Sequence, residues 1–99
     1  MAQPIYKVFL FKMKDSYYQL TQEERDKLMA KGDEIRKKVG GEAVIACVSL
    51  WCSENWLAWG VEKFPDIEAA QKHAQLLWET DWYKYFDAVS YLGTEMAEG

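Results

Sequence analysis

The sequence predicts an α+β fold with the element order β-α-β-β-α-β, in which four antiparallel strands form one sheet and two helices cover one of its faces. Three observations predict this fold. A segment rich in β-branched and aromatic residues opens the chain, two capped helical patterns follow, and a pair of apolar strand-like segments separates the two helices. The length of 99 residues suits one domain, which we expect to span residues 1–99.

The first strand is expected at residues 5–14 and a loop at residues 15–20. A helix then begins at Thr21, whose hydroxyl can accept a hydrogen bond from the backbone N–H of Glu24. The Glu24 carboxylate can reach back to the N–H of Thr21, which completes a capping box. The glycine pair 40–41 ends this helix. Its apolar residues form one narrow stripe, with Gly32 between them: Leu28, Ile35 and Val39.

Two central strands are expected at residues 42–52 and 56–64, and Pro65 breaks the second of them. Asp66 is a good N-cap for the second helix. The pattern leaves open whether this helix runs on through Trp82 or breaks near residues 80–81 and restarts. A last short strand is expected at residues 87–92. The apolar face of the second helix carries Ile67, Ala70, Ala74, Leu77 and Trp78, and the stripe continues through Trp82, Tyr85 and Phe86.

The central strands are apolar on both faces, which is unusual for a small open sheet. Three of the five tryptophans fall between residues 51 and 59. With a two-residue turn on Glu54-Asn55, Leu50 would face Trp59 and Trp51 would face Ala58. A three-residue turn would change the partners. Both faces would then carry mainly apolar side chains, since residues alternate along a strand. The sequence does not indicate which face meets the helices.

The apolar face that the helices leave uncovered predicts an interface. Exposing several hundred Å² of apolar surface forgoes on the order of 10 kcal/mol. Exposed patches of this size usually mark an interaction surface. An identical sheet is the simplest partner, so we expect a homodimer in which two sheets, face to face, make a barrel-like core.

Charge and composition exclude several partners. The net charge is −4, which gives no electrostatic reason to bind nucleic acid or an anionic membrane. RNA-binding domains with this element order carry aromatic and basic residues together on the sheet. Residues 56–64 (WLAWGVEKF) have aromatics but no leading basic residue. We expect no nucleic-acid partner, no membrane span or signal peptide, and a cytoplasmic location.

Cys47 and Cys52 are the only cysteines. If they share a strand, their separation of five points them to opposite faces, so we expect no disulfide between them. Their spacing matches no zinc or redox motif. The single histidine has no partner at metal-ligand spacing, so we expect neither a metal site nor a cofactor.

Two residues are candidate proton-transfer groups. Glu62 follows Ala58 and Gly60 on the small-residue face of its strand, where a carboxyl group in an apolar pocket would have a raised pKa. The alternative is a strand-end glutamate that reaches solvent. His73 borders the apolar stripe of the second helix and could carry protons or ligate haem. The alternative is a half-exposed boundary residue.

The aromatic residues are candidate walls for a ligand pocket, with core or dimer packing as the alternative. Tyrosine and tryptophan can pack against a flat ligand and still present a polar group. The candidates are Tyr6, Trp51, Trp56, Trp59, Trp78, Trp82 and Tyr85.

Several segments give the chain a resemblance to a known family. Residues 6–10 (YKVFL), 18–25 (YQLTQEER) and 82–86 (WYKYF) are similar to small uncharacterised darcynin-like bacterial proteins. These belong to the dimeric α+β-barrel superfamily of ferredoxin-like proteins. Tyr18 and Gln22 differ from the tryptophan and proline of the family pattern. The resemblance implies the fold and the dimer, and it implies no particular reaction.

Two functional hypotheses follow. The protein is a dimer that binds or transforms a small apolar or aromatic metabolite without a metal, as cofactor-independent monooxygenases and isomerases of the wider superfamily do. The alternative is a non-catalytic dimeric module whose aromatic residues serve only its core and interface. The sequence leaves open whether the protein is an enzyme.

Overall fold

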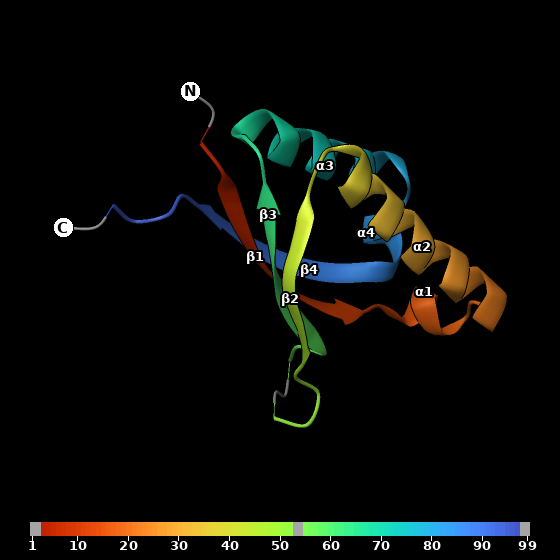
Figure 1. Ribbon diagram of the computed structural model, residues 1–99. Helices are drawn as coiled ribbons and strands as arrows, with labels where there is room; N and C mark the ends of the chain where they lie inside the picture. The colour runs from red at the N-terminus through yellow and green to blue at the C-terminus, as the bar shows by residue number, and fades with distance from the viewer. Residues whose placement is uncertain (1–2, 53–54, 98–99) are drawn as a thin grey trace.

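A computed structural model describes residues 3–52 and 55–97 of the chain (Figure 1). The element order β-α-β-β-α-β is confirmed, with two additional short helices. Antiparallel pairing gives the strand order β2-β3-β1-β4. The elements are β1 (Ile5–Met13), α1 (Asp15–Tyr18), α2 (Gln22–Lys38), β2 (Glu42–Val48), β3 (Ala58–Phe64), α3 (Ile67–Glu79), α4 (Trp82–Tyr85) and β4 (Phe86–Gly93).

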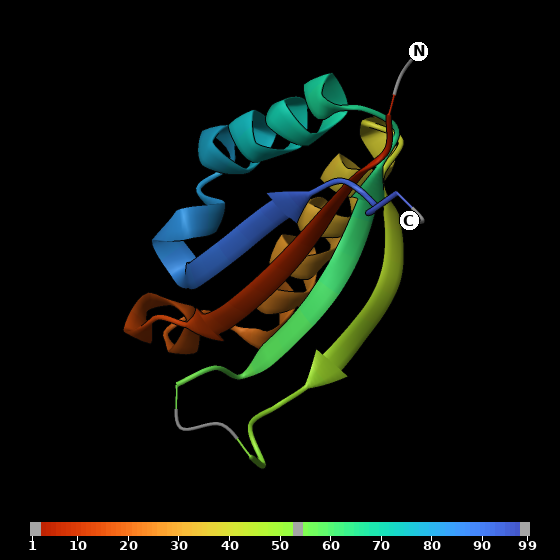
Figure 2. The ribbon, with the colours of Figure 1, turned by 90° about the vertical axis from the view of Figure 1, so that its left-hand side faces the viewer.

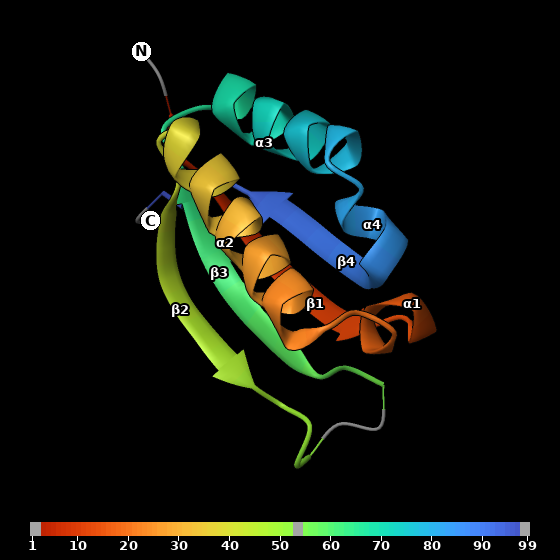
Figure 3. The same ribbon diagram turned by 90° about the vertical axis from the view of Figure 1, so that its right-hand side faces the viewer.

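The long helices α2 and α3 lie on the same side of the sheet. Figure 3 views the sheet from this side, and Figure 2 views the opposite face, which no described helix covers. Because Lys7, Phe9 and Phe11 alternate with Val8 and Leu10 along β1, the two sets point to opposite faces. The structure thus settles which face meets the helices: it is the face that carries Lys7, Glu62 and Gly60.

Both predicted helix caps are present. Thr21 accepts a hydrogen bond from the N–H of Glu24 at 3.1 Å, and the Glu24 carboxylate accepts from the N–H of Thr21 at 2.9 Å. Asp66 caps α3 by accepting from the N–H of Ala69 at 2.8 Å. Two residues after the end of α2, Gly40 adopts a φ of 80°, a conformation that favours glycine.

The helical stripe after residue 79 breaks rather than runs on. Thr80 donates its hydroxyl to the carbonyl of Leu76 at 2.9 Å, and Asp81 adopts a left-handed φ of 61°. The chain then restarts as α4, so the aromatic residues after the break turn toward β4. The segment expected as a loop at residues 15–20 contains the short helix α1.

The predicted register of β2 and β3 is wrong. Val48 pairs with Ala58 and Cys47 with Trp59, in place of Trp51 with Ala58 and Leu50 with Trp59. Glu54, in the expected turn, lies outside the described residues. The reason is a turn at Ser49, whose carbonyl accepts from the N–H of Cys52 at 3.0 Å and whose hydroxyl donates to the carbonyl of Trp56 at 3.0 Å. The strand β2 therefore ends at Val48.

The core lies between β1, β3 and the helices. Phe64 is fully buried beside Ile5 and Ala70, and Val39 packs against them. The stripe of α3 is narrower than predicted, because Trp78 is 71% exposed and Ile67 is also exposed. Phe86, at the start of β4, is also buried, and its ring centroid lies 4.4 Å from that of Trp82.

Candidate functional site

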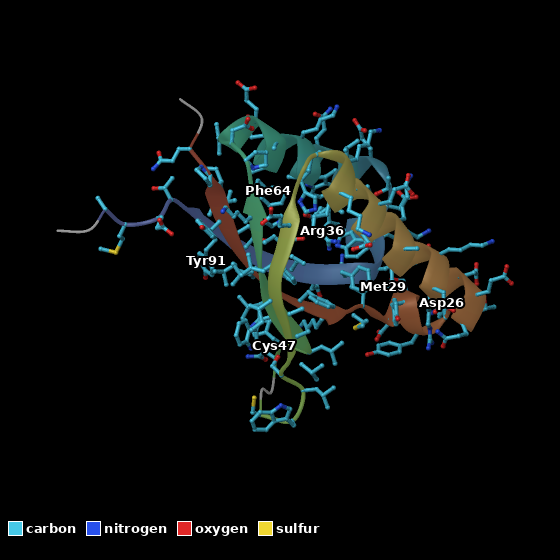
Figure 4. All side chains as sticks on the ribbon, viewed as in Figure 1. Asp26, Met29, Arg36, Cys47, Phe64 and Tyr91 are labelled. Atoms are coloured by element: carbon cyan, nitrogen blue, oxygen red, sulfur yellow. The ribbon has the colours of Figure 1, made fainter. Side chains whose placement is uncertain are left out.

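A cavity of about 340 Å³ lies between the sheet and the helices. Aromatic and aliphatic side chains line one part of it, among them Phe9, Phe11 and Trp82. Side chains that can be charged line another part, from α2, α3, β1 and β3: Lys7, Asp33, Arg36, Glu62 and His73. Figure 4 shows Arg36 extending from α2 toward the strands.

Small residues on the strands make room for this cavity. Gly60 stands opposite Phe9, and a Cβ at this glycine would lie 2.6 Å from the Phe9 ring. Ala58 stands opposite Phe11 in the same ladder. On α2, Gly32 admits the Trp82 ring, to which a Cβ would come within 2.6 Å. The helix and the aromatic rings can therefore approach the sheet closely without filling the space beside Glu62.

Lys7 is the central polar residue of the cavity. It is only 8% exposed, although it stands in the middle of an otherwise apolar strand face. Glu62 is its direct partner across the β1–β3 ladder. The Lys7 Nζ lies 3.4 Å from Nδ1 of His73, which is 3% exposed on α3. Three titratable side chains from three elements thus line the same part of the cavity.

Burial controls the protonation of this group. Desolvation lowers the pKa of Lys7, and the charge of Glu62 opposes this shift. Desolvation raises the pKa of Glu62, against the opposing charges of Lys7 and Arg36. The pKa of His73 is lowered from 6.5 to about 4, mainly by desolvation and also by the charges of Lys7 and Arg36. His73 is therefore neutral near pH 7, and its Nδ1 can accept a hydrogen bond from a charged Lys7.

Arg36 and Tyr83 complete the polar lining. Arg36 pairs with Asp33 through one terminal nitrogen, while its buried Nε has no hydrogen-bond partner among the described residues. Desolvation raises the pKa of the Tyr83 hydroxyl, and the charge of Glu62 adds to this rise. Tyr83 is held in place by the ring of Trp78, 4.8 Å away. The cavity thus presents donors and a proton-transfer group beside an apolar wall.

Of the residues that the sequence singled out, Glu62, His73 and Trp82 line the cavity, and Trp59 borders it from β3, where its strand position belongs to the uncovered face. His73 is buried rather than half exposed, because its ring packs against Phe64 at a centroid distance of 4.9 Å. Glu62 points inward beside Lys7 and is half buried rather than a solvent-facing strand end.

The other five candidates lie away from the cavity lining. Trp51 is 80% exposed in the loop after β2, where its indole N–H donates to the carbonyl of Val48. Trp56 lies under the Lys12 ammonium group, and Tyr6 lies on the uncovered face under that of Lys63. Trp78 supports Tyr83 from outside, and Tyr85 lies beside Lys84.

Sequence reasoning missed Lys7, Arg36 and Tyr83. Lys7 carried a usable signal, because it interrupts the apolar series Ile5, Phe9 and Phe11 on one strand face. A lysine on a buried face is rare and needs a partner. Arg36 and Tyr83 carried no such signal, since each stands among other charged or aromatic residues of its helix.

Cys47 and Cys52 are both free thiols, as expected. Among residues 3–52 and 55–97, no group of three or more His, Cys, Asp or Glu side chains is placed to hold a metal ion. Within the same ranges, no helix combines the length and the apolar composition that crossing a lipid bilayer requires.

The arrangement of strands and helices defines a ferredoxin-like fold. Comparison with solved structures supports this class. The chain is similar to RPA0582, a protein of unknown function from Rhodopseudomonas palustris, with a TM-score of 0.69 at 13% identity over 99% of this chain and 86% of that one. It is also similar to a mutant chlorite dismutase from Candidatus Nitrospira defluvii, with a TM-score of 0.74 at 13% identity over 96% of this chain. The match spans only 41% of the dismutase chain.

Two further similar structures bear on assembly and chemistry. SnoaB, a cofactor-independent oxygenase from Streptomyces nogalater, matches with a TM-score of 0.56 at 14% identity over 98% of this chain and 97% of its own. A dimeric ferredoxin-like protein of unknown function from Bacteroides fragilis matches with a TM-score of 0.51 at 12% identity over 93% and 96%. No protein-family model matches the chain, and comparison with curated protein sequences finds no match.

Proposed function

We propose that the protein binds a small, largely apolar or aromatic metabolite in the cavity and moves a proton on it through Glu62, without a metal. The observation that carries this proposal is the inward-facing Glu62 in a cavity of about 340 Å³, a volume suited to a small organic molecule. A carboxyl group with a pKa raised toward neutrality can both accept and release a proton.

The neighbouring groups suit a reaction in which negative charge develops on the ligand. The Lys7 side-chain nitrogen and the Arg36 Nε, which has no partner among the described residues, are donors at the cavity. Donors held in a water-poor site stabilise a developing oxyanion more strongly than donors in water. His73, with a pKa of about 4, is a weak base, so its role is to position Lys7 rather than to transfer the proton.

We further propose that the uncovered face of the sheet pairs two copies of the chain. Its centre is apolar: Val8 pairs with Tyr91 on one side and Val61 on the other, and Leu10 stands between Val89 and Trp59. Charged pairs flank this centre, with Lys63 opposite Glu42 and Lys12 opposite Asp87. The similarity to a dimeric ferredoxin-like protein supports this assembly.

The dimer is tested by replacing Val8 with glutamate. A carboxylate at the centre of the proposed interface would be desolvated without a partner, so we expect the variant to be a monomer. Sedimentation velocity at micromolar concentration measures this. The matched control is Lys12→Glu, on the same strand and face but at the charged border, which should remain dimeric. A wild-type protein that is monomeric at these concentrations would refute the proposed pairing.

The ligand is tested by native mass spectrometry of the protein purified from its own host, compared with the denatured mass. We expect a bound small molecule, which can then be identified from the mass difference. With the ligand identified, Glu62→Gln should lower its turnover by about 10²- to 10⁴-fold while leaving binding within a few-fold. Glu42→Gln, an exposed change on the neighbouring strand, is the control.

A protein that binds no small molecule would favour the non-catalytic dimeric module, to which the apolar uncovered face is also suited. If the Glu62→Gln variant converts the ligand at the wild-type rate, the cavity remains the binding site but Glu62 takes no part in the proton transfer. These two outcomes therefore separate the binding proposal from the catalytic one.

A further inference from the structure

We infer that Lys7 forms a Schiff base with the carbonyl group of its ligand, so that the cavity takes small apolar or aromatic aldehydes and ketones. This inference rests on the proposed function for the cavity as the ligand site, and it adds a substrate class and a covalent step. The geometry that carries it is a buried primary amine that lines an apolar cavity, hydrogen-bonded to His73 and directly across the ladder from Glu62.

The surroundings of Lys7 suit a nucleophilic amine. A lysine attacks carbonyl carbon only as the neutral amine, and burial in an apolar pocket is the common way to produce this form near neutral pH. Desolvation lowers the pKa of Lys7 accordingly. When the amine donates one N–H to Nδ1 of His73, the nitrogen lone pair stays available for the ligand. His73 thus orients the nucleophile without being charged itself.

Glu62 supplies the proton that the second half of the reaction needs. The Lys7 nitrogen attacks the carbonyl carbon, and a proton passes from the nitrogen to the carbonyl oxygen, which gives a carbinolamine. The Glu62 carboxylic acid then protonates the hydroxyl group, and the C–O bond breaks to release water. The products are a protonated imine on Lys7 and the Glu62 carboxylate. The raised pKa of Glu62 favours the protonated form that begins this step.

Surface lysines provide a built-in comparison. Lys72 precedes His73 on α3 but is exposed, and Lys12 is exposed on the strand that carries Lys7. An exposed amine lacks the desolvation that favours the neutral, nucleophilic form. Selective reaction at Lys7 near neutral pH is therefore a property of the cavity.

The test is reductive trapping of the full-length protein at pH 7 with sodium cyanoborohydride and either 3-phenylpropanal or hexanal. Intact mass spectrometry counts adducts, and peptide mapping locates them. We expect one predominant adduct on Lys7, formed at least about tenfold faster than on Lys72 because a larger fraction of the buried amine is neutral. Lys7→Arg, which keeps the charge, and Lys7→Met, which keeps the shape, should lose this adduct. Lys72→Arg should keep it.

A second measurement separates failure of this inference from failure of the proposed function. The alcohol 3-phenylpropanol has the shape of the aldehyde but no carbonyl group, and its binding beside Trp82 should quench tryptophan fluorescence. Quenching by the alcohol with no preferred adduct on Lys7 would overturn the Schiff base and leave the binding proposal standing. No quenching together with uniform slow labelling of all lysines would overturn the inference and count against the binding proposal as well.

Discussion

Replacing Phe64 with alanine is expected to lower the free energy of unfolding by about 3–5 kcal/mol. The side chain is fully buried, stands opposite Ile5 in the β1–β3 ladder and packs against Ala70 of α3. Its removal would leave a cavity that the rigid ladder cannot close, since both neighbouring strands are held by hydrogen bonds. Urea unfolding followed by circular dichroism measures the change.

The same substitution should disturb the site, because Phe64 lies directly behind the His73 ring. Loss of this support would let His73 move away from Lys7, so selective trapping at Lys7 should weaken in the folded variant. Phe64→Leu is the matched control, and it should cost less than about 1.5 kcal/mol.

Trp78 provides the opposite case. It is a larger aromatic residue on the stripe predicted to be buried, but it is 71% exposed. Trp78→Ala should therefore cost only about 1 kcal/mol, mostly through its contact with Tyr83. A cost for Trp78→Ala that equals the cost of Phe64→Ala would contradict the placement of the core.

The fold could be predicted because its signals are local. The capping box at Thr21, the N-cap at Asp66 and the alternation in β1 each depend on residues within one turn or one strand. The register of β2 and β3 could not be predicted in this way. It depends on hydrogen bonds between Ser49, Cys52 and Trp56 across the loop, and Ser49 carries no signal of a chain-reversing turn in sequence.

The site was predicted in part for a related reason. Glu62 could be placed because strand alternation alone puts it on the face of Ala58 and Gly60. Its neighbours depended on the register of β2 and β3, so Trp51 and Trp56, which were expected beside Glu62, lie outside the cavity lining. The proximity of Lys7 and His73, 66 positions apart in the chain, follows only from the docking of α3 on β1.

Together these observations distinguish the two candidate acid–base residues. Burial favours the neutral form of both side chains. It therefore raises the pKa of the Glu62 carboxyl group and lowers the pKa of the His73 imidazole, away from neutral pH. The charge of Lys7 lowers the pKa of both, which partly offsets burial at Glu62 and adds to it at His73. Burial is therefore the effect that separates two roles that the sequence could not separate.

Acidification should destabilise the fold through His73. The unfolded chain takes up a proton on this imidazole below about pH 6.5, whereas the folded chain does so only below about pH 4. Between these values the unfolded state binds more protons, so the free energy of unfolding decreases as the pH falls. The total contribution is about 3 kcal/mol, present above pH 6.5 and lost by pH 4.

The groups around His73 determine how this loss is measured. Lys7 and Arg36 stay positively charged in the acidic range. Glu62 has the opposite effect on stability, because its pKa is raised in the folded state and the folded chain binds this proton more tightly than the unfolded chain does.

Comparison of the wild type with His73→Asn removes the contribution of Glu62, because Glu62 is present in both proteins. The asparagine amide oxygen can still accept from Lys7, so the variant should fold and should lack the slope between pH 6.5 and 4. Urea titrations across this range measure the slope. Because the chain has one histidine, its imidazole proton resonance reports directly, and it should shift with a midpoint near pH 4. A midpoint near 6.5, or equal slopes for the two proteins, would mean that His73 is hydrated and that the cavity is open to water at its polar end.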